Sequence, residues 1–349
     1  MITPVTRQFD AAIQQVIDNK TKPLGALGML ETLAKQLASI QSHRLARQCA
    51  KISLQQPTML VFAGDHGIAQ HGVSIAPSDV THQMVHNFLA GGAAINCFCR
   101  TNNIDFYVVD AGIKTAIDEA TAVEHPELMI QRLGAGTADF SSQAAMTPEQ
   151  VQQGLDLGKQ AVQRILDQSC ELVMFGEMGI ANTSAASAIF AALSNVPVAA
   201  TVGRGTGISI EQLNQKQLLI QQALARFPSR APLDVLAEVG GFEIVQMIGA
   251  MLACAERKVP MLIDGFIVSV AAFVASQLDA NVRDYFIFAH CSDESAHRIL
   301  LGKLNAKPIL DLSLRLGEGT GAALACPILL AAASFYNDMA SFESAGVTV

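Results

Sequence analysis

The sequence lacks tryptophan and has few charged side chains. Trp is absent from the 349 residues, Tyr occurs three times, and Asp, Glu, Lys and Arg together make up 15%. Half of the residues are apolar, which excludes a disordered or fibrous protein and is enough for a substantial core. We therefore predict a compact globular protein of one large or two modest domains.

Runs of Lys or Arg and closely paired metal-binding cysteines are also missing. With a formal net charge of −8, the chain has no basic stripe, which excludes a nucleic-acid-binding protein. Any anionic ligand must therefore be held locally. The seven cysteines include no CxxC pair, and Cys97 and Cys99 are too close for a zinc knuckle. An odd cysteine count without a signal peptide fits reduced thiols in the cytoplasm.

No hydrophobic run is long enough to cross a membrane. The N-terminus, MITPVTRQFD, lacks the apolar core of a secretion signal. The longest apolar runs, Phe266–Ser276 and Ala322–Phe335, are shorter than the roughly 20 residues that a spanning helix needs, and Pro327 interrupts the second. We expect two buried helices and no membrane span.

Short apolar, β-branched runs alternate with helix-like stretches along most of the chain. This alternation predicts a doubly wound, mostly parallel α/β sheet flanked by helices. The predicted strands are Thr58–Ala63, Asp105–Asp110, Leu172–Gly176, Val196–Val202, Val259–Asp264, Asp284–Ala289 and Pro308–Leu312.

The two ends of the chain carry helical patterns without strands. We expect residues 1–49 and 321–349 to form a small helical domain, and residues 50–320 to form the large α/β domain that carries the active-site loops. The polar stretch 137–153 is predicted to be a surface excursion in which Pro148 and Glu149 begin a helix.

The loop RLGEGTGAALA, residues 315–325, has the densest chemical signal. Gly317 and Gly319 allow a ligand to approach the backbone, and the start of the following helix favours negative charge. Glu318 would repel an anion there, so we interpret it as a proton-handling residue. The alternative is a dinucleotide fingerprint, GxGxxA, with Glu318 as a solvated spacer, but the strand that should follow is missing.

A second loop, GEMGIANTSAA, places another carboxylate among glycines. Glu177 follows a predicted strand, and Asn182 and Thr183 offer polar groups at a helix start. A capped helix with Glu177 in its first turn is an equally good interpretation.

A third loop, VGRGTGI, combines glycines with cations. Gly203, Arg204 and Gly205, with Lys216 farther along, suit a phosphate, although a plain turn with an exposed Arg204 is the alternative. Ser292 could bind the same phosphate or could simply cap a helix.

Histidines near residue 70 raise the question of a metal site. His82 and His86 would share one face of a helix, with Asp65 and Asp79 as possible oxygen ligands. There is no HExxH pattern, and we expect these histidines to form hydrogen bonds rather than to bind a metal.

Taken together, the loops resemble the nicotinate-nucleotide:dimethylbenzimidazole phosphoribosyltransferase family, which makes the lower-ligand nucleotide of cobalamin. The resemblance covers nearly the whole chain, and it is carried by eight motifs in order: KPLGALGMLE, AGDHGIAQHGVS, NFLAGGAAIN, GEMGIANTSAA, GRGTG, DGF, HCSDE and RLGEGTGAALA. Two positions depart from it, because Ala181 stands where the family often has Gly and Met29 where Arg is common.

The resemblance implies a reaction and a set of site residues. The 5-phosphoribosyl group of nicotinate mononucleotide would pass to 5,6-dimethylbenzimidazole with inversion at C1, without a cofactor, in a homodimer. Glu318 would be the general base, Glu177 would lie in the same site, and Gln83 would contact the benzimidazole. The nucleotide phosphate and ribose would be surrounded by Gly179, Gly205, Lys216, Gly265 and Ser292.

Two other functions remain possible from the residues alone. One is a nucleotide-dependent oxidoreductase that uses the GxGxxA pattern, and the other is a non-catalytic carrier of azoles or nucleotides. The sequence does not identify which lower-ligand base is used.

Overall fold

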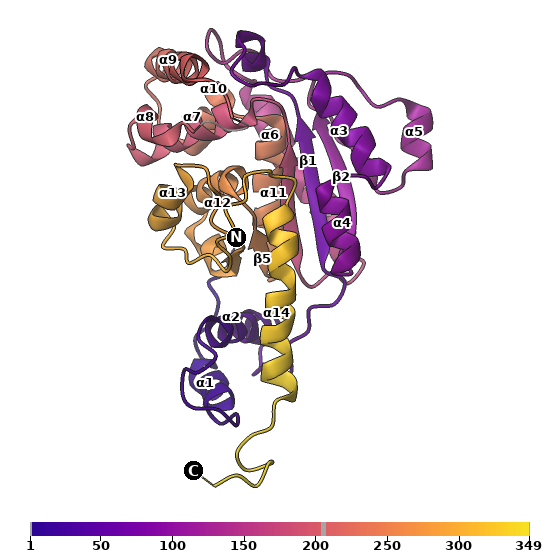
Figure 1. The fold of residues 1–349 in the computed structure, drawn as a ribbon, viewed down its shortest axis with the longest axis vertical. Coiled ribbons are helices and arrows are strands. Elements are labelled where there is room, and N and C mark those ends of the chain that lie inside the picture. The colour runs from indigo at the N-terminus through magenta and orange to yellow at the C-terminus, as the bar shows by residue number, and fades with distance from the viewer. Residues whose placement is uncertain (1, 204–206, 349) are drawn as a thin grey trace.

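A single parallel sheet forms the centre of the computed structural model, which describes residues 2–203 and 207–348 (Figure 1). Within these residues the sheet has six strands in the order β3-β2-β1-β4-β5-β6, and every pair is parallel. The predicted doubly wound α/β fold is confirmed. The strands are β1 (Thr58–Gly64), β2 (Asp105–Gly112), β3 (Leu128–Ile130), β4 (Val173–Met178), β5 (Met261–Ile263) and β6 (Phe286–Phe288).

Helices cover both faces of the sheet. On β1, Leu60 and Phe62 belong to the hydrophobic cluster of one face, whereas Met59 and Val61 belong to that of the other. The apolar cluster on the first face includes residues of α6 (Pro148–Leu166), α7 (Asn182–Ser194), α8 (Val198–Thr201), α9 (Ile210–Arg226), α10 (Pro232–Val239), α11 (Phe242–Glu256), α12 (Phe266–Leu278) and α13 (His297–Lys303). The cluster on the second face includes residues of α1 (Asp10–Asp18), α2 (Met29–Leu45), α3 (Asp79–Leu89), α4 (Ala94–Thr101) and α14 (Thr320–Asp338). The remaining helices of the described residues are η1 (Gly67–His71), α5 (Glu119–Glu124) and η2 (Ala280–Tyr285).

Two predicted strands are not strands of the sheet, and one strand was missed. Residues 196–202 contain the helix α8 instead, which begins after Pro197; β4 already pairs with β1 and β5, so no edge is open beside it. Residues 308–312 contribute only one bridge, between Leu310 and His290. The missed strand is β3, whose three residues are too few to give a pattern.

The predicted helix start at Pro148 is confirmed. Thr147 accepts a hydrogen bond from the Gln150 backbone N–H at 3.2 Å, and the Gln150 side chain accepts one from the Thr147 N–H at 2.9 Å. This reciprocal capping, with Pro148 as the first helical residue, fixes where α6 begins.

The helices from the two chain ends pack against each other and against the sheet. The lower part of Figure 1 shows α1 and α2 beside α14, and α14 also contacts α4, β4 and β5. Their apolar side chains form one continuous cluster with those of the sheet, and the division into two domains stays a prediction.

One described helix, α14, is long and apolar enough to cross a membrane by length and composition alone. More than half of the relevant window, 56%, is buried inside the protein, and Pro327 lies within the helix. Both α12 and α14 are thus buried helices, as the sequence predicted.

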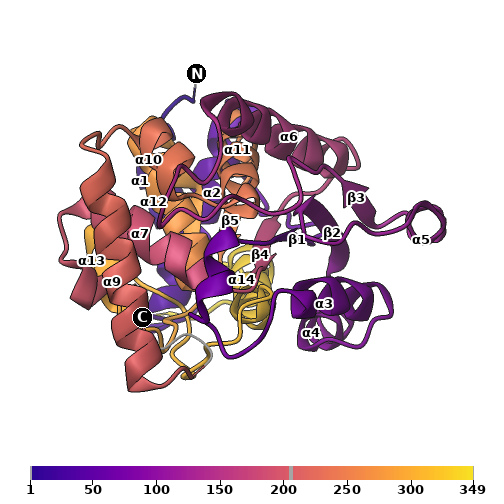
Figure 2. The same ribbon diagram turned by 90° about the horizontal axis from the view of Figure 1, so that it is seen from above.

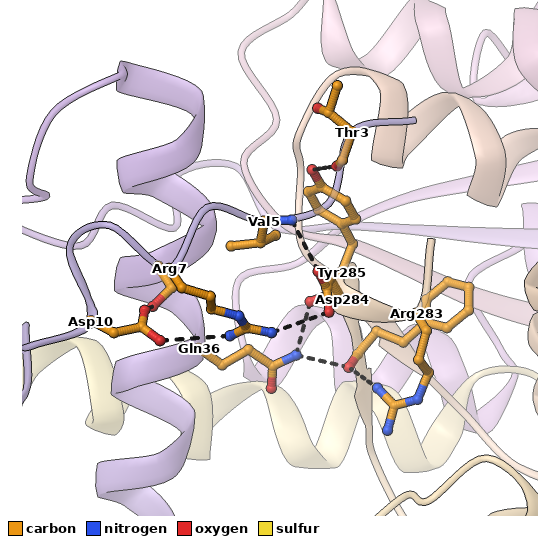
Figure 3. Close-up of polar contacts among 10 residues, drawn as sticks. Thr3, Val5, Arg7, Asp10, Gln36, Arg283, Asp284 and Tyr285 are labelled. Atoms are coloured by element: carbon orange, nitrogen blue, oxygen red, sulfur yellow. Dashed lines mark hydrogen bonds and ion pairs between the residues drawn. The ribbon is translucent and has the colours of Figure 1, made fainter. Parts of the chain in front are cut away.

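The N-terminal segment is held along η2 and β6 by polar contacts (Figure 3). The Val5 backbone N–H donates to Asp284 at 2.9 Å, and the Tyr285 hydroxyl donates to the Thr3 carbonyl at 2.9 Å. From α2, the Gln36 amide donates to the Phe286 carbonyl at 3.0 Å. These bonds connect the start of the chain to the edge of the sheet.

Candidate active site

A cavity of about 280 Å³ lies at the carboxyl ends of β4 and β5, between the loop that leads into α14 and residues of the segment 73–84, which follows β1 in the chain. The strand order reverses between β1 and β4, and open α/β sheets bind their ligands in the crevice at such a reversal. Figure 2 shows β4, β5 and α14 close together near the middle of the molecule.

Most of the predicted site residues line this one cavity, although they come from distant parts of the chain. The predicted residues that line it are Glu177, Gly179, Asn182, Thr183, Lys216, Gly265, Ser292, Gly317 and Glu318.

The other predicted residues do not line the cavity or cannot be placed. Gln83 is exposed on α3, while its neighbours Val80 and Met84 do line the cavity. Gly203 lies against the side chain of Glu294, which does line it. Gly319 is the residue that precedes α14. Arg204 and Gly205 fall outside the described residues.

Glu318 is held in the cavity wall by an unusual backbone. Gly317, Glu318 and Gly319 all have left-handed conformations, with φ of 88°, 62° and 85°. For a residue with a side chain this conformation costs about 1 kcal/mol or more. Glu318 is 6% exposed, and its carboxylate accepts a hydrogen bond from the Ile95 backbone N–H at 3.2 Å. Burial raises the pKa of Glu318, the bond from Ile95 opposes this, and the charge of Asp264 adds to it.

Glu177 lies on β4, beside the Glu318 loop. The Glu318 backbone N–H donates to the Glu177 carbonyl at 3.3 Å, and the Asn182 amide donates to the Glu177 carboxylate. Burial, together with the charges of Asp264, Glu243 and Glu318, raises the pKa of Glu177 to about 8. Since α7 begins only at Asn182, the interpretation of Glu177 as a first-turn residue is wrong.

Gly176 allows the Glu318 loop to touch the sheet. A Cβ atom at position 176 would collide with the backbone of Glu318, and its distance to the Gly319 nitrogen would be 2.7 Å. Real Cβ atoms essentially never come this close to backbone atoms. Any other residue at position 176 would therefore displace the loop that carries Glu318.

Asp264, which follows β5, is a site residue to which sequence reasoning assigned no role. Its carboxylate accepts a hydrogen bond from the Ala322 backbone N–H at 2.8 Å and lies 3.6 Å from His290 Nε2. The sequence predicted that the start of α14 would attract a ligand anion, but a carboxylate of the protein itself takes that position. The signal was available, since Asp264 ends a predicted strand in the DGF motif.

Lys216 brings a buried cation to the cavity. Its side chain is 1% exposed, and its Nζ donates to the Thr183 hydroxyl at 2.7 Å. Burial lowers the pKa of Lys216 to about 8, and the negative charge of Glu294 opposes this shift. Below that pH the ammonium group stays charged.

Ser292 and Gly265 line the cavity after β6 and β5. The Ser292 backbone N–H donates to His297 Nδ1 at 2.8 Å, and the Ser292 hydroxyl accepts from the Glu294 N–H at 3.3 Å. Gly265 faces His290, and a Cβ atom there would lie 3.1 Å from His290 Nε2. Because α13 begins only at His297, Ser292 is not a simple helix cap.

The histidines near residue 70 are engaged in hydrogen bonds. His66 Nε2 lies 2.8 Å from Glu243, His71 Nε2 lies 2.7 Å from Asp139, and the Nε2 atoms of His82 and His86 are 3.3 Å apart. Among residues 2–203 and 207–348, no group of three or more His, Cys, Asp or Glu could hold a metal ion.

Comparison with known proteins supports what the arrangement suggests. A phosphoribosyltransferase family model matches residues 2–347. The chain is 57% identical over 343 residues to the nicotinate-nucleotide–dimethylbenzimidazole phosphoribosyltransferase of Vibrio cholerae, covering 98% of this chain and 99% of that protein. The chain belongs to this phosphoribosyltransferase family.

Other members of the family are similar over the same length. The phosphoribosyltransferase of the same name from Photobacterium profundum is 57% identical, covering 100% of this chain and 99% of that protein. The crystal structure of CobT from Thermus thermophilus superposes with a TM-score of 0.92 at 42% identity, covering 98% of this chain and 99% of that one.

Membership of the phosphoribosyltransferase family makes the chain a pentosyltransferase. The assignment as a pentosyltransferase replaces the two alternative interpretations, a non-catalytic carrier and a nucleotide-dependent oxidoreductase. The GxGxxA pattern also lacks its expected surroundings, because the residues before it form one isolated bridge rather than a strand, whereas a dinucleotide fingerprint follows a strand directly.

Proposed function

We propose that the chain transfers the 5-phosphoribosyl group of nicotinate mononucleotide to 5,6-dimethylbenzimidazole, giving α-ribazole 5'-phosphate and nicotinate. The names of the relatives support these substrates. The cavity supports them too, because it combines a buried cation, Lys216, with apolar walls and three buried carboxylic acids, Glu177, Asp264 and Glu318. Such a site suits an anionic nucleotide and a flat apolar base.

The chemical demand of this reaction lies at the acceptor. The pyridinium nitrogen of nicotinate mononucleotide is already positively charged, so nicotinate can leave without being protonated. One nitrogen of the benzimidazole attacks C1 of the ribose while the other loses its proton, and attack opposite to the leaving group converts a β-nucleotide into an α-nucleotide. A carboxylate must therefore lie beside the acceptor to take the proton.

We assign Glu318 as the general base. The observation that supports this assignment is that its carboxylate is buried in the cavity wall, where its pKa is raised. A raised pKa strengthens a carboxylate as a base near neutral pH. Burial raises the pKa of Glu177 to about 8, so this carboxyl group is mostly protonated at neutral pH. It is therefore the poorer candidate for a base and the better candidate for a hydrogen-bond donor.

We place the nucleotide phosphate at the end of the cavity that contains Lys216. The ammonium group, the Thr183 hydroxyl and the Ser292 hydroxyl are the polar groups that we assign to the phosphate, and Gly179 and Gly265 also line the cavity. Holding the phosphate fixes the ribose, so that C1 stays opposite the acceptor.

We place the benzimidazole against the apolar wall formed by Val80 and Met84 of α3 with Ile180 and Phe266. The exposed side chain of Gln83 would have to turn toward the cavity to contact the base. The resemblance also supports a homodimer. If the protein is a homodimer, light scattering should measure twice the mass of one chain.

Replacement of Glu318 by Gln tests the proposed mechanism. Product formation from nicotinate mononucleotide and 5,6-dimethylbenzimidazole is followed by mass spectrometry, and nucleotide binding by calorimetry. General-base assistance typically supplies ~10² to 10⁴ in rate, so E318Q should lose most of its turnover and keep its nucleotide affinity. E124Q, at an exposed position of α5, serves as the control. An unimpaired rate in E318Q would remove Glu318 from the mechanism.

A further inference from the structure

We propose that Asn96 is a positioning residue for the reaction: its side chain fixes the start of α4 so that the Ile95 backbone N–H is directed at the Glu318 carboxylate. The inference rests on the proposed function, since it takes Glu318 as the general base. It assigns a role to the NFLAGGAAIN motif, residues 87–96, whose side chains do not line the cavity.

The contact between α4 and Glu318 is direct. Ile95 is the second residue of α4, and its N–H donates to Glu318 Oε2 at 3.2 Å in a buried environment. The first backbone N–H groups of a helix have no partner within the helix and carry partial positive charge. The start of α4 is thus suited to hold one carboxylate oxygen, which leaves the other oxygen of Glu318 for the cavity.

Asn96 uses both ends of its side-chain amide to hold this helix start in place. Its Oδ1 accepts from the Ala93 N–H at 3.1 Å, and its Nδ2 donates to the Phe88 carbonyl at 3.0 Å. Asn96 is 6% exposed, so neither bond competes with bulk water. The two bonds tie the end of α3 to the beginning of α4.

The turn between these helices leaves little freedom. A Cβ atom on Gly92 would collide with the Asn87 side chain, and Gly91 has a left-handed conformation with φ of 74°. The turn is therefore compact, and the direction of the Ile95 N–H depends on the Asn96 bonds. Met84 of α3 lines the cavity in the wall that we assign to the benzimidazole. The Asn96 bonds between α3 and α4 therefore also connect this wall to the helix that holds Glu318.

The bond from Ile95 has a definite effect on Glu318. A donor that stabilises the ionised carboxylate lowers the pKa of that group, in opposition to burial. The other titratable groups around Glu318 are Glu177 on β4, Asp264 after β5, and His290, which adjoins Asp264. They stay in place when Asn96 is replaced, so a change in the pH profile reports on the Ile95 bond.

The test compares Asn96→Ala with Asn102→Ala. Asn102 is a matched control, since it lies at the other end of α4 and its side chain donates to the Ala323 carbonyl at 3.0 Å. A hydrogen bond to a charged group contributes enough for about a tenfold change in kcat and about one pH unit in the acidic limb of the profile. In N96A we expect kcat to fall and this limb to move to higher pH, with an unchanged KM for the nucleotide. In N102A we expect the acidic limb of the kcat profile to lie at the same pH as in the native enzyme.

A second measurement does not depend on how well N96A folds. The native enzyme is labelled with ¹⁵N-isoleucine, and the Ile95 amide signal, assigned through the I95V variant, is followed against pH by NMR. We expect it to titrate together with the acidic limb of kcat, and to stop titrating in E318Q. A signal that does not titrate, or an N96A profile with the native limb, would overturn the role of Asn96.

The two proposals can fail separately. If E318Q keeps full turnover, Glu318 is not the base and the proposed mechanism fails. If E318Q is inactive while N96A has the native pH profile, the mechanism stands and only the positioning role is lost.

Discussion

The carboxylate of Asp264 accepts a hydrogen bond from the backbone N–H of Ala322 at 2.8 Å. Ala322 is the third residue of α14, so the protein fills the anion-attracting end of this helix with its own charge. Asp264 also raises the pKa of the nearby Glu318. One side chain thus caps the helix that follows Glu318 and affects how strongly Glu318 holds a proton.

Replacement of Asp264 by Asn should separate these two effects. The Asn oxygen can still accept from Ala322, but the negative charge is gone, so the pKa of Glu318 should fall. In the proposed mechanism Glu318 must be ionised to act as the base, so the acidic limb of kcat should move to lower pH. The profile is measured between pH 5 and 8, with D156N, at an exposed position of α6, as the control. A limb that moves upward would contradict the role of Asp264.

Loss of the charge at Lys216 should weaken nucleotide binding. We expect K216M to raise the KM for nicotinate mononucleotide by about 10- to 100-fold with a smaller change in kcat, since a charge-assisted hydrogen bond contributes about 1.5–3 kcal/mol. Methionine replaces the buried chain with little change in volume. In the native enzyme, KM should also rise above pH 8, because the pKa of Lys216 is about 8. K159M, on the surface of α6, should behave as the native enzyme, and an unchanged KM in K216M would exclude Lys216 from phosphate binding.

Glu177 should make stability depend on pH. Its pKa in the folded protein is about 8, above the ordinary value of 4.5, so the unfolded chain ionises first and the native protein loses stability as pH rises from about 4.5 to 8. The variant E177Q cannot ionise. The difference in Tm between E177Q and the native protein should therefore grow in favour of E177Q over this range, whereas E124Q should show no such trend. A constant difference would mean that Glu177 is ionised in the folded protein.

Ala181 should store backbone strain. It precedes α7 with φ of 74°, a conformation that costs a residue with a side chain about 1–2 kcal/mol. We expect A181G to stabilise the protein by up to about 1 kcal/mol, since the greater freedom of glycine in the unfolded chain offsets part of the gain. Urea unfolding measures the change. The control A331G, at an exposed position inside α14, should destabilise the protein by a similar amount, and a loss of stability in A181G would show that the position is not strained.

The sheet could be predicted from the sequence because its central strands are buried on both faces. All seven residues of β1 are buried, which gives a continuous apolar run. Residues 196–202 are also mostly apolar, yet they contain α8, because an apolar pattern does not reveal that both edges of β4 are already paired. Pairing is a property of the whole fold, and a local pattern cannot report it.

The part of the site that could be predicted consists of polar residues within glycine-rich loops, such as Glu177 and Glu318. Asp264 and Asn96 were missed as site residues for a physical reason. Each acts through a bond to a backbone N–H, of Ala322 and Ala93 respectively. The place of Asp264 at a strand end was visible in the sequence, but the sequence does not show which backbone group a side chain will contact. Gln83 was assigned to the acceptor pocket by resemblance alone, and the helical spacing of Val80 and Met84 would have been the better guide to the face of α3 that lines the cavity.

The close contact between Gly176 and the Glu318 backbone has a consequence for inheritance. Every base substitution that changes the amino acid encoded by a glycine codon adds at least one carbon atom to the side chain. Position 176 has no conservative neighbour in the genetic code, and a loss of activity there would come from a residue that takes no part in the chemistry.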